Sequence, residues 1–210
     1  MTTSVTARGN AKFARRALIA IGVLLAVSLV ALVVAVTLSH KIDGSSMRPT
    51  FGDDDRVLLE PFFDSADLQR FDVVAARPTP GAPAIVKRVI GLPGDRVRVE
   101  VRPDGTGVLH LLPSGAAQWQ TVDSAAWPGQ WKSARVCCQT SGKTGPDAGA
   151  VVPAGSVFLM GDNPDQSDDS RVFGWIPSDQ VVGRLWLRIY PVAEFGALDH
   201  TGEFRLTPVS

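Results

Sequence analysis

The stretch that decides the fold class is Ala84-Ile-Val-Lys-Arg-Val-Ile-Gly-Leu-Pro-Gly-Asp-Arg-Val-Arg-Val-Glu-Val101. Two runs rich in β-branched residues flank the turn sequence Gly91-Leu-Pro-Gly-Asp95. The second run, Arg96–Val101, alternates charged and apolar side chains, as a strand with one solvated face does. The pattern predicts two strands separated by a tight turn, and therefore a mainly β protein.

Short apolar runs between turn signals continue in both directions from this stretch. Between about Pro103 and Ala150 the chain instead becomes rich in Gly, Pro, Ser, Ala and Thr, with few apolar runs. We therefore predict a β core formed by residues 39–102 and 151–210, with residues 103–150 as an inserted, loop-rich smaller lobe. The other strands that we expect are Arg56–Glu60, Asp72–Ala76, Ser156–Met160 and Val182–Ile189.

A long apolar run, Ala17–Leu38, precedes this β-rich part and contains no charged residue. As a helix it would span roughly 33 Å, enough to cross a bilayer core, and it is too long for the apolar region of a cleaved secretory signal. The residues before it include Arg8, Lys12, Arg15 and Arg16 and no acidic residue. The positive-inside rule predicts a single-pass anchor, with residues 1–16 cytoplasmic and the remainder on the outer face.

Composition excludes several classes of function. The 210 residues carry 21 basic and 21 acidic side chains, and this zero balance argues against a nucleic-acid partner. Histidines and cysteines show no zinc-ligand spacing, and the aspartates of residues 161–171 do not match a calcium loop, so we expect no metal and no cofactor. The adjacent Cys137 and Cys138 cannot make a disulfide framework, and we expect a structural or incidental role for them.

Two residues stand out as candidates for chemistry. Ser46 lies in the turn-like segment Asp43–Thr50, where backbone N–H groups can surround an exposed hydroxyl. Lys87 lies in an otherwise apolar strand, where burial would lower its pKa and let the neutral amine act as a base. Because neighbouring strand residues face opposite ways, we expect one of Lys87 and Arg88 to be solvated. Taken singly, a linker serine and a surface lysine are the commoner interpretations.

Three segments behind an apolar anchor resemble the boxes of bacterial type I signal peptidases. Ser46-Met-Arg-Pro-Thr50 is similar to an S-M-x-P-T box, and Val86–Asp95 is similar to a K-R-V-x-G-x-P-G-D box. Gly161–Arg171 is similar to a G-D-N-x-x-x-S-x-D-S-R box. The resemblance implies a largely antiparallel β fold with an inserted lobe, Ser46 as nucleophile and Lys87 as general base.

The same resemblance assigns supporting roles within the third box. It implies that Ser167 hydrogen-bonds to Lys87 and orients it, that Asp169 and Arg171 form an ion pair, and that Asp162 helps to hold the loop. Four positions depart from the common pattern. Gly44 stands where many members have serine, and Phe71 stands where glycine is common. In the third box, Pro164 replaces the usual arginine and Gln166 the usual asparagine.

The missing side chain at Gly44 affects the expected oxyanion hole. This hole would consist of the backbone N–H of Ser46 and another donor, for which Ser45 is a candidate. Apolar residues beside the dyad, namely Ile42, Ile85 and Val86, would line shallow pockets for small substrate side chains.

The expected function is removal of N-terminal signal peptides from secretory precursors after sites of the Ala-x-Ala type. Ser46 follows Leu38 by eight residues, so it can lie at most about 28 Å from the end of the anchor, near the bilayer surface. One alternative is a membrane-anchored β-rich binding or assembly protein with a decayed dyad. Another, a self-cleaving serine–lysine regulator, would need a DNA-binding domain that the N-terminal segment does not provide.

Overall fold

A computed structural model describes residues 3–102, 104, 106–125, 127, 131, 149–199 and 204–209. Cys137 and Cys138 lie outside these residues. The chain divides into two compact units, Met1–Ser39 and His40–Ser210.

Helix α1 (Thr3–Leu38) accounts for the described part of the first unit. Its segment Lys12–Leu38 has a mean hydropathy of 3.1, and none of this segment is buried. By length and composition it is the one described helix that can cross a membrane. The predicted anchor, residues 17–38, lies within it.

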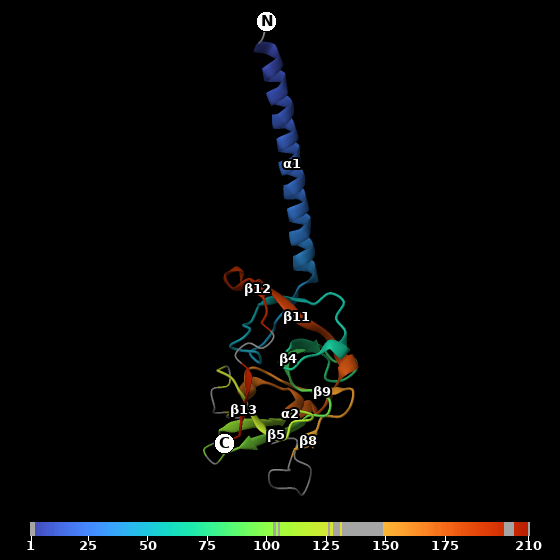
Figure 1. The fold of residues 1–210 in the computed structure, drawn as a ribbon, viewed down its shortest axis with the longest axis vertical. Coiled ribbons are helices and arrows are strands. Elements are labelled where there is room, and N and C mark those ends of the chain that lie inside the picture. The colour runs from blue at the N-terminus through green and yellow to red at the C-terminus, as the bar shows by residue number, and fades with distance from the viewer. Residues whose placement is uncertain are drawn as a thin grey trace. The chain divides into compact units, whose positions relative to one another are not determined.

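The second unit contains an eight-stranded sheet in which every strand pair is antiparallel (Figure 1). The strand order is β1-β2-β11-β3-β4-β9-β10, and β12 pairs with β11. Register shifts along β11 curl the sheet. The strands are β1 (His40–Lys41), β2 (Arg56–Leu59), β3 (Val73–Ala76), β4 (Ile85–Gly91), β9 (Ser156–Met160), β10 (Ile176–Pro177), β11 (Val181–Tyr190) and β12 (Gly196–Ala197).

A second, five-stranded antiparallel sheet has the order β13-β7-β6-β5-β8. Two of its strands, β6 and β7, lie within the range 103–150 that the sequence predicted to be loop-rich. The strands β5 and β13 come from outside that range, and β8 lies at its boundary. The strands are β5 (Arg96–Val101), β6 (Gly107–Leu112), β7 (Gln120–Asp123), β8 (Ala150–Val151) and β13 (Arg205–Pro208).

The expected strands of the main sheet are confirmed, as is the mainly β fold class. Short helical turns connect the strands. They are η1 (Ser65–Asp67), η2 (Pro164–Gln166), α2 (Ser170–Phe173), η3 (Ser178–Gln180) and η4 (Val192–Glu194).

The loop that carries Ser46 is anchored by its apolar neighbours. Met47 and Phe51 are buried in one hydrophobic cluster with Val57 of β2 and Leu185 of β11. Full burial of such side chains contributes about 1.5–3 kcal/mol each. Ser46 is thereby held on a loop whose two ends belong to the core.

The expectation that either Lys87 or Arg88 would be solvated is wrong. The two side chains are only 4% and 2% exposed. Both faces of β4 are covered, because Lys87 meets the Ser46 loop while Arg88 pairs with Asp162 and lies 4.3 Å from the ring centroid of Phe204. A strand between two covered faces has no solvated side for either residue.

Phe71 occupies the turn before β3 with a φ of 74°. This left-handed conformation is the one that glycine adopts most readily, so Phe71 takes the backbone geometry of the residue it replaces. Its ring is buried against Phe204, with the centroids 5.7 Å apart. Burial in the core offsets the backbone cost of the turn.

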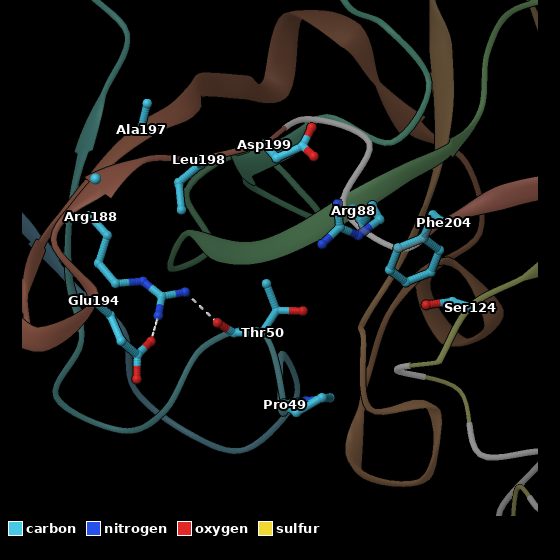
Figure 2. A pocket seen from close by; sticks show the side chains of 11 residues that line it. Pro49, Thr50, Arg88, Ser124, Arg188, Glu194, Ala197, Leu198, Asp199 and Phe204 are labelled. Atoms are coloured by element: carbon cyan, nitrogen blue, oxygen red, sulfur yellow. Dashed lines mark hydrogen bonds and ion pairs between the residues drawn. The ribbon is translucent and has the colours of Figure 1, made fainter.

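A cavity of about 420 Å³ lies between the Ser46-bearing loop and the C-terminal strands (Figure 2). Thr50, Arg88, Arg188 and Phe204 are among its lining residues. Neither Ser46 nor Lys87 lines it.

Candidate active site

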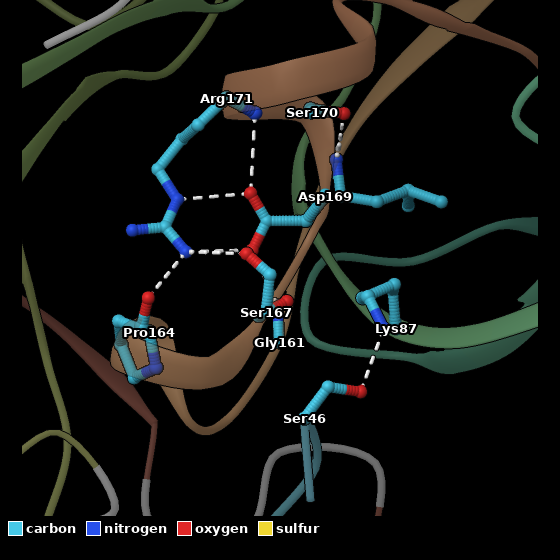
Figure 3. A network of polar contacts seen from close by, with 9 residues as sticks. Ser46, Lys87, Gly161, Pro164, Ser167, Asp169, Ser170 and Arg171 are labelled. Atoms are coloured by element: carbon cyan, nitrogen blue, oxygen red, sulfur yellow. Dashed lines mark hydrogen bonds and ion pairs between the residues drawn. The ribbon is translucent and has the colours of Figure 1, made fainter. Parts of the chain in front are cut away.

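Ser46 and Lys87 meet across the second unit (Figure 3). The Nζ of Lys87 donates a 2.8 Å hydrogen bond to Oγ of Ser46 and a 2.9 Å bond to the carbonyl oxygen of Val86. Burial lowers the pKa of Lys87 from 10.5 to about 8, against the opposing effect of Asp169, Asp162 and Asp168. A buried amine that loses its proton near pH 8 can accept a proton from a serine hydroxyl.

The turn before Ser46 depends on Gly44. This glycine has a φ of 94°, and its N–H donates to Oδ1 of Asp53 at 2.6 Å. L side chains rarely adopt such a φ. The glycine at position 44, where many family members have serine, therefore suits the backbone conformation of this turn.

The third box holds the Ser46 turn from the opposite side. The N–H of Asn163 donates to the carbonyl of Ser46 at 2.9 Å, and its side-chain amide donates to the carbonyl of Ser45 at 3.1 Å. The hydroxyl of Ser45 donates to Gln166. Among the described residues the N–H of Ser46 has no hydrogen-bond acceptor, so it is available to a ligand.

Asp169 and Arg171 form a buried bidentate pair at the start of α2 (Figure 3). Nε and Nη2 of Arg171 each lie 2.9 Å from a carboxylate oxygen of Asp169. The same carboxylate accepts the N–H of Gly161 at 3.1 Å and caps α2 through the N–H of Arg171. Nη2 of Arg171 also donates to the carbonyl of Pro164 at 2.8 Å. This network fixes the shape of the loop 161–171.

Asp162 links the loop to both halves of the dyad. It accepts two hydrogen bonds from Arg88, of 2.8 and 2.6 Å, and one of 2.5 Å from the hydroxyl of Thr50. Arg88 follows Lys87 in the chain, and Thr50 ends the segment that begins at Ser46. Sequence reasoning missed Arg88 and Thr50 as site residues, although both stand inside the boxes that it identified.

Ser167 lies close to the dyad-bearing turn. A Cβ atom on Gly161 would lie 2.5 Å from the carbonyl oxygen of Ser46 and closer still to Oγ of Ser167. The Ser167 hydroxyl is buried and has no hydrogen-bond partner among the described residues. The predicted hydrogen bond to Lys87 is not formed in this structure.

A cleft of about 180 Å³ opens beside the dyad. Ser46 and Lys87 line it together with Ile42, Ile85 and Val86, which are the residues predicted to form the substrate pocket. Lys41, Asp43, Met47 and Ala84 complete the lining. Within the part of the chain that the structure describes, no cluster of His, Cys, Asp or Glu could hold a metal ion.

Comparison with known proteins gives the family. The family model described as "Signal peptidase, peptidase S26" matches residues 14–190. The chain belongs to this signal peptidase family. It is therefore a serine endopeptidase of the signal peptidase I type, whose reaction is removal of signal peptides.

The sequence relatives from Staphylococcus aureus and Synechocystis agree with this assignment. Signal peptidase IB of Staphylococcus aureus (strain Mu50) is 31% identical over 160 residues, which are 74% of this chain and 79% of the relative. The probable signal peptidase I-2 of Synechocystis is 28% identical over 176 residues, covering 80% and 70%. A solved signal peptidase I from Enterococcus faecalis V583 is 26% identical, with a TM-score of 0.38, covering 57% of this chain and 97% of the other.

Proposed function

We propose that this protein cleaves signal peptides from secretory precursors with Ser46 as nucleophile and Lys87 as general base, and that α1 anchors it in the membrane. The observation that carries the proposal is the 2.8 Å contact between Nζ of Lys87 and Oγ of Ser46, at a lysine that is only 4% exposed. At this distance a protonated amine donates to the hydroxyl, whereas a neutral amine accepts the hydroxyl proton.

The reaction is acyl transfer in two halves. Lys87 takes the Ser46 proton as Oγ attacks the scissile carbonyl, and the resulting ammonium protonates the leaving amine of the mature protein. The signal peptide then remains as an ester on Ser46. Neutral Lys87 next activates a water molecule, which releases the signal peptide as a carboxylate and returns the proton to Oγ.

The N–H of Ser46 is the backbone donor for the developing oxyanion. It has no acceptor among the described residues, while the Ser45 hydroxyl is bonded to Gln166. For Ser45 to act as the second donor, its hydroxyl would have to exchange Gln166 for the oxyanion. An oxyanion-hole donor contributes about 10²–10³ in rate, so this exchange would matter to turnover.

The cleft beside the dyad favours an extended substrate with small side chains. Ile85 and Val86 pair with β3 along one edge of β4, whereas the pairing of β4 with β9 begins only at Arg88. An extended segment that lies along this edge would place its first and third residues before the cut on the same side. A cleft of about 180 Å³ lined by Ile42, Ile85 and Val86 suits alanine at both positions.

The chain path supports action at the membrane surface. Ser46 lies only eight positions after Leu38, a reach of at most about 28 Å. In the proposed topology the basic segment before α1 stays in the cytoplasm and the β unit faces outward. The site would then lie at the level where a membrane-inserted precursor presents its cleavage site.

Cleavage of a precursor with an Ala-x-Ala site, in detergent, tests the proposal. Wild type, Ser46→Ala and Lys87→Met are compared, with Ser65→Ala of η1 as a control outside the site. We expect wild type and the control to cleave after the second alanine, and each dyad variant to lose about 10³-fold or more. Full activity in either dyad variant would refute its assigned role. An inactive wild type in both detergent and lipid would favour the non-catalytic binding protein.

A further inference from the structure

Arg188 of β11 reaches the far end of the loop that carries Ser46 (Figure 2). It is 8% exposed, and its Nη2 donates to the carbonyl oxygen of Thr50. Its guanidinium carbon also lies 4.6 Å from the ring centroid of Phe51. Arg188 therefore contacts two consecutive residues at the end of the Ser46–Phe51 segment.

Two carboxylates hold Arg188 from other elements. Its Nη1 pairs with Glu194 of η4 and lies 3.7 Å from Oδ2 of Asp55, which precedes β2. A planar guanidinium with partners on several sides has little freedom to reorient. The position of the Thr50 carbonyl is thus set by groups outside the loop.

Thr50 connects Arg188 to the surroundings of the dyad through hydrogen bonds. Its carbonyl accepts from Arg188, and its hydroxyl donates to Asp162, which pairs with Arg88 beside Lys87. Thr50 is consequently held by its carbonyl to β11 and by its hydroxyl to the loop that follows β9. A shift at Thr50 would reach Ser46 through only four peptide bonds, in a segment where Met47 is buried and Arg48 and Pro49 are exposed.

We infer that Arg188 is a positioning residue, which sets the placement of the Ser46 turn against Lys87. The inference rests on the proposed role of Ser46 as nucleophile. Arg188 lies outside all three boxes, so neither the sequence pattern nor the dyad contact identifies it. A misplacement of about 1 Å at a reacting centre can cost about 10²-fold in rate.

Arg184 provides a matched control on the same strand. It is also largely buried and binds two carboxylates, those of Glu60 and Asp72, at 2.6 and 3.1 Å. Among the described residues its side-chain hydrogen bonds go to these two carboxylates and not to the Ser46–Phe51 segment. Arg184→Met and Arg188→Met therefore each remove a guanidinium that pairs with two carboxylates, and only the second removes a contact with the nucleophile loop.

The experiment measures kcat, KM and Tm of the full chain in detergent, with a fluorogenic peptide that carries an Ala-x-Ala site. We expect Arg188→Met to lower kcat by about 10–100-fold with KM changed by less than about 3-fold. Its pH midpoint should match that of wild type, because the surroundings of Lys87 are intact. Arg184→Met should show a similar loss of Tm without the loss of kcat.

Chemical rescue separates positioning from folding. In Arg188→Ala the carboxylates and the Thr50 carbonyl remain, so free guanidinium, well below unfolding concentrations, should restore part of kcat. Arg184→Ala should not respond. Equal kcat values for Arg188→Met and Arg184→Met, with Ser46→Ala inactive, would overturn the inference about Arg188 alone. Equal cleavage by wild type and Ser46→Ala would overturn the proposed nucleophile and this inference with it.

Discussion

Nζ of Lys87 lies 2.8 Å from Oγ of Ser46, although the two residues are 41 positions apart in the chain. The lysine comes from a strand that is covered on both faces, and the serine comes from a loop anchored by Met47 and Phe51. Burial does two things here, since it brings the groups into contact and makes the ammonium form costly. The predictions below separate these effects.

The pH dependence of cleavage reports the protonation of Lys87. Because its pKa is lowered to about 8, kcat/KM should rise about tenfold per pH unit below this value and level off above it. The measurement is a pH–rate profile of the wild type in detergent, with the Tm recorded at each pH. A midpoint near 10.5 would show that burial does not make Lys87 a base near neutral pH.

Lys87 should weaken the fold at neutral pH. Its pKa is about 8 in the folded state and 10.5 in the unfolded state, so folding disfavours the bound proton. The cost is present in full below about pH 8 and disappears as the pH rises to about 10.5. This difference in pKa corresponds to roughly 3 kcal/mol of unfolding free energy. A variant that removes Lys87 also loses its hydrogen bond to Ser46, which offsets about 1 kcal/mol of the gain.

Lys87→Met should therefore unfold at higher urea than wild type at pH 7, and this advantage should vanish near pH 10.5. Tryptophan fluorescence of the β unit follows the transition at the two pH values. A difference in unfolding free energy that is the same at both values would contradict the assigned pKa.

The Arg88–Asp162 pair should be sensitive to removal of either member. Both side chains are almost fully buried, at 2% and 0% exposure, so Arg88→Met or Asp162→Leu leaves a buried charge without its ion-pair partner in this contact. Each single change should cost about 3–5 kcal/mol of unfolding free energy. The double variant should lose less than either single variant, as measured by urea unfolding. The exposed pair Arg205–Asp123 is the control, and its loss should cost about 1 kcal/mol or less.

Gly161→Ala should impair catalysis more than stability. The added Cβ would lie 2.5 Å from the carbonyl oxygen of Ser46, a backbone atom that cannot move without moving the nucleophile. We expect kcat to fall about 10–100-fold. Gly196→Ala is the matched control, because its Cβ would meet no heavy atom within 4 Å. Equal kcat in the two variants would show that the Ser46 turn can shift freely.

Ser167→Ala tests whether this hydroxyl orients Lys87 during turnover. The hydroxyl is buried and has no partner among the residues that the structure describes, so its removal should leave Tm unchanged or slightly raised. If Ser167 orients the amine when substrate is bound, kcat should nevertheless fall by about 10-fold or more. Unchanged kcat would remove Ser167 from the proposed site.

Local patterns in the sequence were enough to predict much of the protein. Short continuous segments of about five to twenty residues encode the apolar helix, the three boxes and the strands β2 to β5, β9 and β11. Periodicity and turn residues act over such distances, which is why these elements are recognisable without a structure. Strands β6 and β7 were missed because glycine and proline around them outweighed a short apolar run.

Contacts between distant segments were decided by the tertiary structure alone. Arg88 is buried because its partner Asp162, which lies 74 positions away, covers a face that the strand pattern left open. Arg188 contacts Thr50 across 138 positions, and no local pattern connects them. The sequence by itself therefore determined which residues carry the chemistry that we propose. Their placement depends on side chains brought together only when both faces of the curled sheet are covered.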